Sequence, residues 1–462
     1  MLADPLLGHH KKPFVKLKSK DRWRQALQRV TVMDGLGTDE LREVTVDELK
    51  SRFFSLGMQV GIALQMFVIS VLIMLTAYDD ESGSGGVIHE LSSVYYSLFR
   101  ALFLICFFFS CYGVNLFMWK RFDIDYLSIL KVGHEHNYHF VIRASFTRMS
   151  VVFSCFVLYV LALRSPNAWF LPGKHSLPAS AIVGTFLLSL WPTNLMPEWK
   201  DRAQRFALLG SLGRLLLSPL FAAPFASTFI ADVLTSMPKI FTDMLLTGCM
   251  YASGLAFKVH YDVKAHALVG AEGTTCTNAD PTFAWAAFAL SIFPFWIRLM
   301  QCLRAYATDR ETRHLFNSLK YCTSISVVVL STLAGHNHAL KPYWAVLACA
   351  STLFAYVWDL KMDWGHPALV APEHPGEPAR RYPAWSYNVA ACTNAVARLG
   401  WAVYISPDQK VVQQHMILLL GCVELMRRAQ WAAFRLEWEQ HKMDKKAAEE
   451  EAAKGATAAH GP

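Results

Sequence analysis

Long runs of apolar residues constrain this chain more than any other feature. Six stretches with at most one charged side chain each are long enough to cross a bilayer, because a helix needs about 20 apolar residues for this. Charged residues make up 17% of the 462 residues, whereas soluble domains usually carry about 25%. The sequence therefore predicts an integral membrane protein. The six stretches are residues 53–77, 94–118, 146–163, 177–196, 283–300 and 343–360.

Four more polar stretches are also candidate spans and raise the expected total to about ten. They are residues 229–257, 320–334, 385–405 and 411–435. The predicted fold is all-α, a polytopic bundle of transmembrane helices. The segment between the first two spans is acidic and contains no Lys or Arg, so it is expected to face away from the cytosol. An even number of spans then places both termini in the cytosol.

The segments outside the spans are polar. Residues 1–52 lack a short apolar core with a small-residue cleavage site, so we expect a cytosolic segment and not a secretory signal. Residues 201–223 have basic and apolar sides and predict an interfacial amphipathic helix. Residues 363–382, rich in proline and charge, predict a cytosolic linker. The tail at 444–462 is low in complexity and is expected to extend the last helix or to be disordered.

Cysteine and histidine give no indication of a disulfide or a metal site. Nine of the ten cysteines lie inside apolar runs, and Cys276, in a loop expected outside the cytosol, has no obvious partner. The histidines that lie close together in sequence are His134, His136, His139, His336 and His338. Packing or exposure within their loops explains them better than metal binding. We therefore expect neither a metal nor a cofactor.

Several functional classes lack support in the sequence. The net charge is +8, but the basic residues lie mainly at the ends of apolar runs, which is typical of cytoplasmic loops. No groove-reading motif for nucleic acid is present. Neither a Walker A loop, nor a GxSxG motif, nor a nucleophile–base set is visible. The sequence thus predicts no nucleic-acid partner, no ATP-driven pump and no enzyme.

Charged residues inside the later spans are the strongest indication of function. A charge near the bilayer centre costs several kcal/mol unless it is paired or faces water. So many charges in one half of the chain predict a polar interior. Helical spacing places most of those in the last span on one stripe. The residues concerned are Asp232, Lys320, Arg398, Glu424, Arg427, Arg428, Arg435 and Glu439.

Cations outnumber carboxylates in this set, which predicts an anion site. A guanidinium presents a fixed fork of N–H donors that suits an oxyanion, and phosphate is the commonest such solute. Nearby aspartates could balance charge in the empty site or relay protons. The alternative is that these charges pair with one another and hold the bundle together.

The second half of the chain resembles a known family, the EXS domain. Six strings occur in that family's order: FIADVLTSM (229–237), PFWIRLMQCLRAY (294–306), HLFNSLKY (314–321), VWDLKMDWG (357–365), ARLGW (397–401) and ELMRRAQWAAFRLEWE (424–439). Upstream, YGVNLFMWKRFDIDY (112–126) is also similar. The family includes the xenotropic and polytropic retrovirus receptor, plant root-to-shoot phosphate exporters and the yeast ER-retention-defective protein. The resemblance divides the membrane part into N-terminal helices at 53–200 and an EXS-like domain at 201–443.

The resemblance implies a phosphate pathway lined by residues of these strings. They are Asp232, Lys320, Tyr321, Arg398, Trp401, Glu424, Arg427 and Arg428. Thr235 stands where the family has Asn, and its hydroxyl can still donate to phosphate. The two acidic residues of the WDLKMDWG string, Asp359 and Asp363, are expected to cap a helix end or to act in gating.

The resemblance also implies a place in the cell. The large exporters carry an SPX domain that binds inositol pyrophosphates, and the 52 residues before the first span are too few for it, so such regulation is not expected within this chain. The short form resembles the yeast protein, which favours the Golgi membrane and return of phosphate from the lumen to the cytosol. Efflux at the plasma membrane, or another endomembrane, is the alternative.

Two functions from different classes follow. The first is a channel-like pathway that exports or recycles inorganic phosphate. The second is a Golgi sorting or scaffold protein that retains glycosylation enzymes, with structural buried charges. Expected partners are phosphate and the lipid bilayer, and a homodimer is compatible with this fold.

Overall fold

The computed structural model describes the membrane-embedded part of the chain in most detail. The described residues are 29–31, 43–78, 95–131, 138–164, 210, 213, 215, 217, 221, 223–255, 260–262, 267–269, 275–277, 279–369, 378–400, 402 and 410–459. The chain divides into two compact units, Met1–Met58 and Gln59–Pro462.

The first unit contains a short antiparallel hairpin of β1 (Arg29–Thr31) and β2 (Glu43–Thr45), followed by the start of α2 (Val46–Tyr78). A second hairpin, β3 (His260–Asp262) and β4 (Ala267–Val269), lies in the second unit. Apart from these two short hairpins, the described elements are helical, which agrees with the predicted all-α fold. Each strand has three residues, and so short a strand leaves no alternation of apolar residues long enough to recognise in the sequence.

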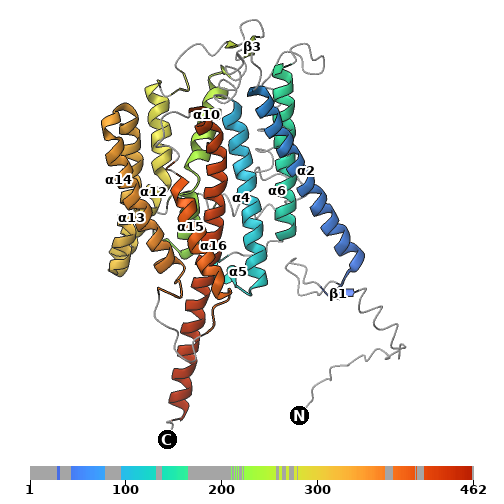
Figure 1. The fold of residues 1–462 in the computed structure, drawn as a ribbon. Coiled ribbons are helices and arrows are strands. Elements are labelled where there is room, and N and C mark those ends of the chain that lie inside the picture. The colour runs from blue at the N-terminus through green and yellow to red at the C-terminus, as the bar shows by residue number, and fades with distance from the viewer. Residues whose placement is uncertain are drawn as a thin grey trace, which may run out of the picture. The chain divides into compact units, whose positions relative to one another are not determined.

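The second unit is a bundle of helices. Figure 1 shows the long helices lying side by side, and α4 packs against α6, α10 and α16, while α12 packs against α13. Its helices are α4 (Tyr95–Arg121), α5 (Tyr126–Leu130), α6 (Tyr138–Arg164), α9 (Phe225–Leu234), α10 (Pro238–Ala252), α12 (Pro281–Asp309), α13 (Thr312–His336), η1 (His338–Leu340), α14 (Lys341–Trp358), η2 (Asp359–Asp363), α15 (Ala384–Arg398) and α16 (Lys410–Ala459).

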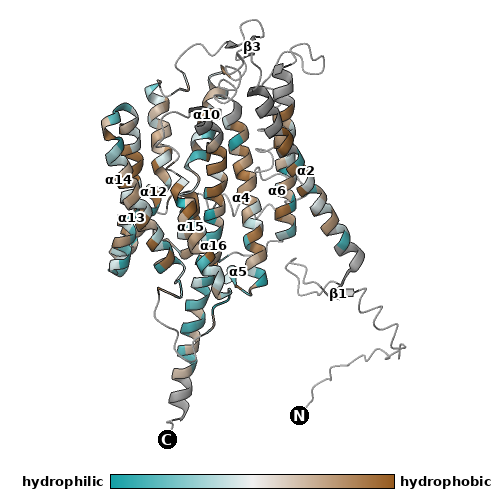
Figure 2. Cartoon of the chain, viewed as in Figure 1, coloured by the Kyte–Doolittle hydropathy of each residue, from teal (hydrophilic) through white to brown (hydrophobic). Residues whose placement is uncertain are grey.

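Five helical segments among the described residues are long and apolar enough to cross a membrane, which confirms the predicted membrane class. They are Ser97–Arg121, Tyr138–Val157, Pro281–Asp309, Thr312–His336 and His338–Asp363. Figure 2 shows the apolar colouring of α4 and α12 over most of their length. The predicted span at 177–196 and most of the predicted interfacial helix at 201–223 lie outside the described residues. The total of ten spans and the cytosolic termini stay predictions.

The predicted span at 229–257 is wrong as a single helix, because the structure divides it into α9 and α10. Thr235, Ser236 and Met237 lie between the two helices, and Pro238 is the first residue of α10. Proline has no N–H to continue the helix, and its ring disfavours the helical conformation of the preceding residue. The chain therefore breaks inside the bundle.

The last helix is much longer than the predicted span at 411–435. α16 has 50 residues, which corresponds to a length of about 75 Å, while the hydrocarbon core is about 30 Å thick. Figure 2 shows that the C-terminal half of α16 is mainly hydrophilic. α16 continues through the polar tail as far as Ala459.

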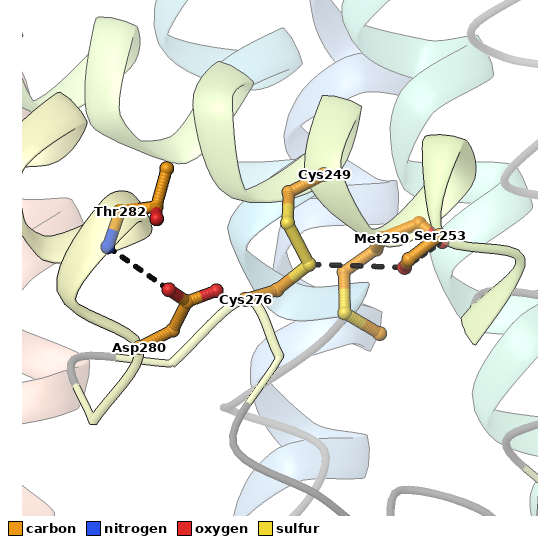
Figure 3. Close-up of a disulfide and its surroundings, with 6 residues drawn as sticks. All are labelled: Cys249, Met250, Ser253, Cys276, Asp280 and Thr282. Carbon is orange, nitrogen blue, oxygen red and sulfur yellow. Dashed lines mark hydrogen bonds between the residues drawn. A yellow bond between two sulfur atoms is a disulfide. The ribbon is translucent and has the colours of Figure 1, made fainter.

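A disulfide overturns the prediction that Cys276 has no partner. Cys276 is bonded to Cys249, in the last turn of α10, and the pair is 27 residues apart (Figure 3). Four residues after Cys276, Asp280 caps α12 by accepting a hydrogen bond from the Thr282 amide at 2.9 Å. Cys249 lies in an apolar run, where the sequence gives no sign of a disulfide. Its pairing with Cys276 depends on the chain reversing direction after α10. Among the described residues no cluster of metal ligands is found, and His134 and His136 lie outside them.

Candidate functional site

A cavity of about 360 Å³, with many polar side chains in its lining, lies among α9, α12, α13, α14, η2, α15 and α16. A water molecule occupies roughly 30 Å³ in the liquid, so the cavity has room for a small anion and part of its hydration shell. The polar side chains that line it are Asp232, Thr235, Lys320, Tyr321, Ser324, Asp359, Asp363, Arg398, Glu424, Arg427 and Arg428. Four of these are cations and four are carboxylates.

Eight of the nine residues predicted for the pathway line this cavity. Asp232 and Thr235 come from α9 and its end, Lys320 and Tyr321 from α13, and Arg398 from α15. One face of α16 supplies Glu424, Arg427 and Arg428. The ninth residue, Trp401, lies outside the described residues. Residues far apart in sequence therefore meet at one place.

Two of the four lining cations are neutralised by carboxylates. Arg427 donates from Nε to Glu424 Oε2 at 2.7 Å and from Nη2 to Oε1 at 2.6 Å. Arg398 donates from Nη2 to Asp359, while Nη1 of Arg427 lies 3.7 Å from the same carboxylate. Buried Asn394 donates to Asp359 at 3.1 Å. These pairs support the view that part of the charge holds the bundle together.

The other two lining cations contact no carboxylate within 4.0 Å among the described residues. Arg428 donates from Nε to Ser236 Oγ at 2.7 Å and from Nη2 to Thr235 Oγ1 at 2.9 Å. The Nζ atom of Lys320 lies 4.6 Å from the centroid of the Tyr321 ring and 5.1 Å from that of Trp358. The helix break between α9 and α10 provides the hydroxyls that Arg428 contacts. These two cations keep charge that a bound anion could neutralise.

Asp232 also belongs to a hydrogen-bond network that includes residues outside the cavity lining. Arg298 of α12 donates from Nε to Asp232 Oδ1 at 2.8 Å and from Nη1 to Gln301 Oε1 at 2.6 Å. The hydroxyl of Tyr321 also donates to Asp232. Sequence reasoning missed Arg298, although it stands in one of the six strings. Its position in an otherwise apolar span was the signal that could have identified it.

The acidic residues of η2 are part of the cavity wall, a role that the sequence left open. Asp359 and Asp363 are the first and last residues of this short π-helix, and both line the cavity. Asp363 accepts a hydrogen bond from Nε1 of Trp431 at 3.0 Å and lies 3.6 Å from Arg435. π-Helical turns are rare and frequently mark functional sites.

The predicted surplus of positive charge is smaller than expected. With Arg298 added to the lining residues, five cations face four carboxylates. The predicted set had three carboxylates, Asp232, Glu424 and Glu439, beside five cations, whereas folding brings Asp359 and Asp363 into the cavity wall. One further donor is available, because Nε of Arg398 is buried without a hydrogen-bond partner among the described residues.

Comparison with known proteins assigns this architecture to a family. The model of the EXS family matches residues 95–441. The SPX and EXS domain-containing protein 1 of Dictyostelium discoideum is 25% identical over 406 residues, which are 83% of this chain and 40% of that protein. Phosphate transporter PHO1 homolog 8 of Arabidopsis thaliana is 27% identical over 413 residues, covering 87% and 52% of the two chains. Phosphate transporter PHO1 of the same plant is 26% identical over 398 residues, covering 83% and 47%. The chain spans about half the length of these curated relatives.

Proposed function

Since this chain belongs to the EXS family, we propose that it transports inorganic phosphate across a membrane through the cavity among α9, α12, α13, α14, η2, α15 and α16. Two of the relatives are named phosphate transporters, which supports phosphate as the solute. A transport role also agrees with the helices that are long enough to span a bilayer.

The observation that carries this proposal is that two lining cations, Arg428 and Lys320, have no carboxylate within 4.0 Å among the described residues. An unneutralised charge within a membrane costs several kcal/mol unless water or a counter-ion reaches it. Here both side chains line a cavity of about 360 Å³. A phosphate ion can accept hydrogen bonds from the Arg428 fork, the Lys320 ammonium and the free Nε–H of Arg398.

The carboxylates that line the cavity favour a transport pathway over a site that retains its ion. A transported ion must bind strongly enough to enter and weakly enough to leave. Asp232, Asp359, Asp363 and Glu424 repel an anion while they orient the cations, and so they limit its affinity. Tyr321, and Trp401 by resemblance, would narrow the passage.

We extend the proposal to the place and direction of transport. The resemblance to the family that includes the yeast ER-retention-defective protein favours the Golgi membrane and return of phosphate from the lumen to the cytosol, with efflux at the plasma membrane as the alternative. Imaging of a tagged full-length chain beside Golgi and plasma-membrane markers distinguishes the two locations.

The direct test is flux of radiolabelled phosphate into liposomes that contain the purified chain. Wild type is expected to transport phosphate in preference to sulfate. Arg428→Gln should lower the rate roughly 10- to 100-fold, because hydrogen bonds to charged groups are worth about 1.5–3 kcal/mol. The matched control is Arg313→Gln, since this arginine is 56% exposed and pairs only with Glu311 among the described residues. Absence of wild-type flux, or wild-type flux in Arg428→Gln, would contradict the proposal.

The scaffold function keeps one specific observation in its favour. α16 continues as a hydrophilic helix well beyond the length needed to cross a bilayer, and such an extension could bind enzymes to be retained. Truncation after Lys442 would then abolish retention of glycosylation enzymes while Arg428→Gln would not. If phosphate transport is the function, Arg428→Gln is expected to have the larger effect and the truncation after Lys442 the smaller one.

A further inference from the structure

The segment that follows η2 is fastened to α16 by Arg380, a residue outside the cavity. The guanidinium of Arg380 donates to the backbone carbonyl of Trp364 at 2.8 Å and to that of Gly365 at 3.2 Å. Its Nε donates to Glu437 Oε1 at 3.1 Å, and its Nη2 lies 2.8 Å from Glu437 Oε2. One side chain therefore joins the end of η2, the segment before α15, and α16.

These contacts are buried and involve the whole guanidinium. The side chains of Arg380 and Glu437 are 9% and 0% exposed. The guanidinium carbon also lies 5.0 Å from the centroid of the Tyr387 ring and 4.7 Å from that of Trp438. A lysine could supply the charge, but its ammonium cannot present the planar fork that reaches a carboxylate and two carbonyls together.

The contacts of Arg380 hold the C-terminal end of η2, and η2 carries two of the four carboxylates that line the cavity. Trp364 directly follows Asp363, and its amide donates to the Asp359 carbonyl at 2.9 Å. The His366 amide donates to the Leu360 carbonyl at 2.9 Å. These two bonds close the π-helical turn from its C-terminal side. The residues that close the turn therefore lie in the segment whose carbonyls Arg380 contacts.

Gly365 shows how closely this segment approaches α16. Its φ is +52°, a conformation that other residues rarely adopt, and a Cβ atom there would lie 2.5 Å from the Trp438 ring. Trp364 is fully buried and packs against Phe434. The end of η2 is thus seated on α16 by backbone approach as well as by Arg380.

We propose that Arg380 is a positioning residue of the anion pathway: it ties Trp364 and Gly365 to Glu437 and so keeps Asp359 and Asp363 directed into the cavity. This inference rests on the proposed function. Asp359 orients Arg398 and Arg427, and Asp363 contacts Arg435. When the end of η2 is released, Arg398 loses the carboxylate that orients its free Nε–H toward a bound anion.

The variant Arg380→Gln in the full chain, reconstituted in liposomes, tests the proposal. The half-saturating phosphate concentration is expected to rise on the order of tenfold, as when supporting partners of ligand-binding side chains are removed, while the maximal rate changes much less. Arg380→Lys should lie between wild type and Arg380→Gln. The matched control is Arg381→Gln, because this neighbour is 34% exposed and pairs with Asp444 at 2.8 Å. It should behave as wild type.

Hydrogen exchange of the peptide at 359–369 gives a readout that needs no phosphate. Exchange of the Trp364 and His366 amides is expected to accelerate in Arg380→Gln and not in Arg381→Gln. Lack of phosphate flux in the wild type would overturn the proposed function. Faster amide exchange in Arg380→Gln would still show that Arg380 holds the end of η2. Wild-type half-saturation in folded Arg380→Gln would overturn the positioning role. Failure of both Arg380 variants to fold would also overturn it, because Arg380 would then serve folding alone.

Discussion

Two buried charge clusters of this protein are built in opposite ways. Between α4 and α10, Arg100 donates to both oxygens of Asp243 at 2.7 Å, and Lys239 lies 2.8 Å from the same carboxylate. The side chains of Arg100 and Asp243 are 5% and 2% exposed. In the cavity, by contrast, Arg428 contacts hydroxyls and Lys320 contacts rings.

The difference shows that a buried charge within a membrane indicates function or packing only when its partner is known. In the first cluster a carboxylate satisfies the cations directly, and the pair can serve packing alone. In the cavity, hydroxyls orient Arg428 and aromatic rings contact Lys320, and neither cation has a carboxylate within 4.0 Å among the described residues.

The largest effect is expected on stability, from Asp243→Asn. The substitution removes the negative charge that Arg100 and Lys239 share, and breaking a buried pair typically costs about 3–5 kcal/mol. Transport per folded molecule should stay close to wild type. Denaturant unfolding in detergent measures the first quantity, and liposome flux the second. Lost transport with unchanged stability would show that this cluster belongs to the pathway.

Lys320→Met is expected to have a smaller effect, on transport and not on stability. Flux should fall about tenfold, equivalent to about 1.4 kcal/mol, because one of the two available cations is gone. Stability should be unchanged or higher, since no carboxylate within 4.0 Å among the described residues is left without its partner. The same two measurements apply. A marked loss of stability would mean that Lys320 is a structural charge like Arg100.

The smallest effect concerns Thr235, where the hydroxyl accepts a hydrogen bond from Arg428 at 2.9 Å. Thr235→Val keeps the shape and removes the acceptor, so flux should fall by roughly fivefold, corresponding to about 1 kcal/mol. Thr235→Asn, which restores a polar side chain, should stay near wild type. Equal flux in both variants would indicate that this hydroxyl does not orient Arg428 for transport.

Much of this architecture was accessible from the sequence. Five predicted spans correspond to helices that can cross a membrane, and eight predicted pathway residues line one cavity. Both predictions rest on local signals: apolar run length for the spans, and charge in an apolar context, with family strings, for the site. The helix break before Pro238 also has a local signal in the proline itself, although the length of the stretch at 229–257 predicts one continuous span.

Other features depend on contacts that no local pattern contains. The disulfide between Cys249 and Cys276 needed the chain to turn back after α10. The placement of Asp359 and Asp363 in the cavity needed the π-helical end of α14 to be seated on α16. Arg380 lies in a segment expected to be a linker, and its partner Glu437 is 57 residues away.

The amino-acid order alone determined that this chain enters a membrane and which of its charges enter with it. The cost of exposing a residue to hydrocarbon depends on that residue and its near neighbours along one helix. Only the tertiary structure decided which cations are neutralised, because ion pairing acts over a few ångströms between residues distant in sequence. Arg298 meets Asp232 across 66 positions and Arg398 meets Asp359 across 39, whereas Arg428 meets only hydroxyls and a ring among the described side chains within hydrogen-bonding or cation–π range.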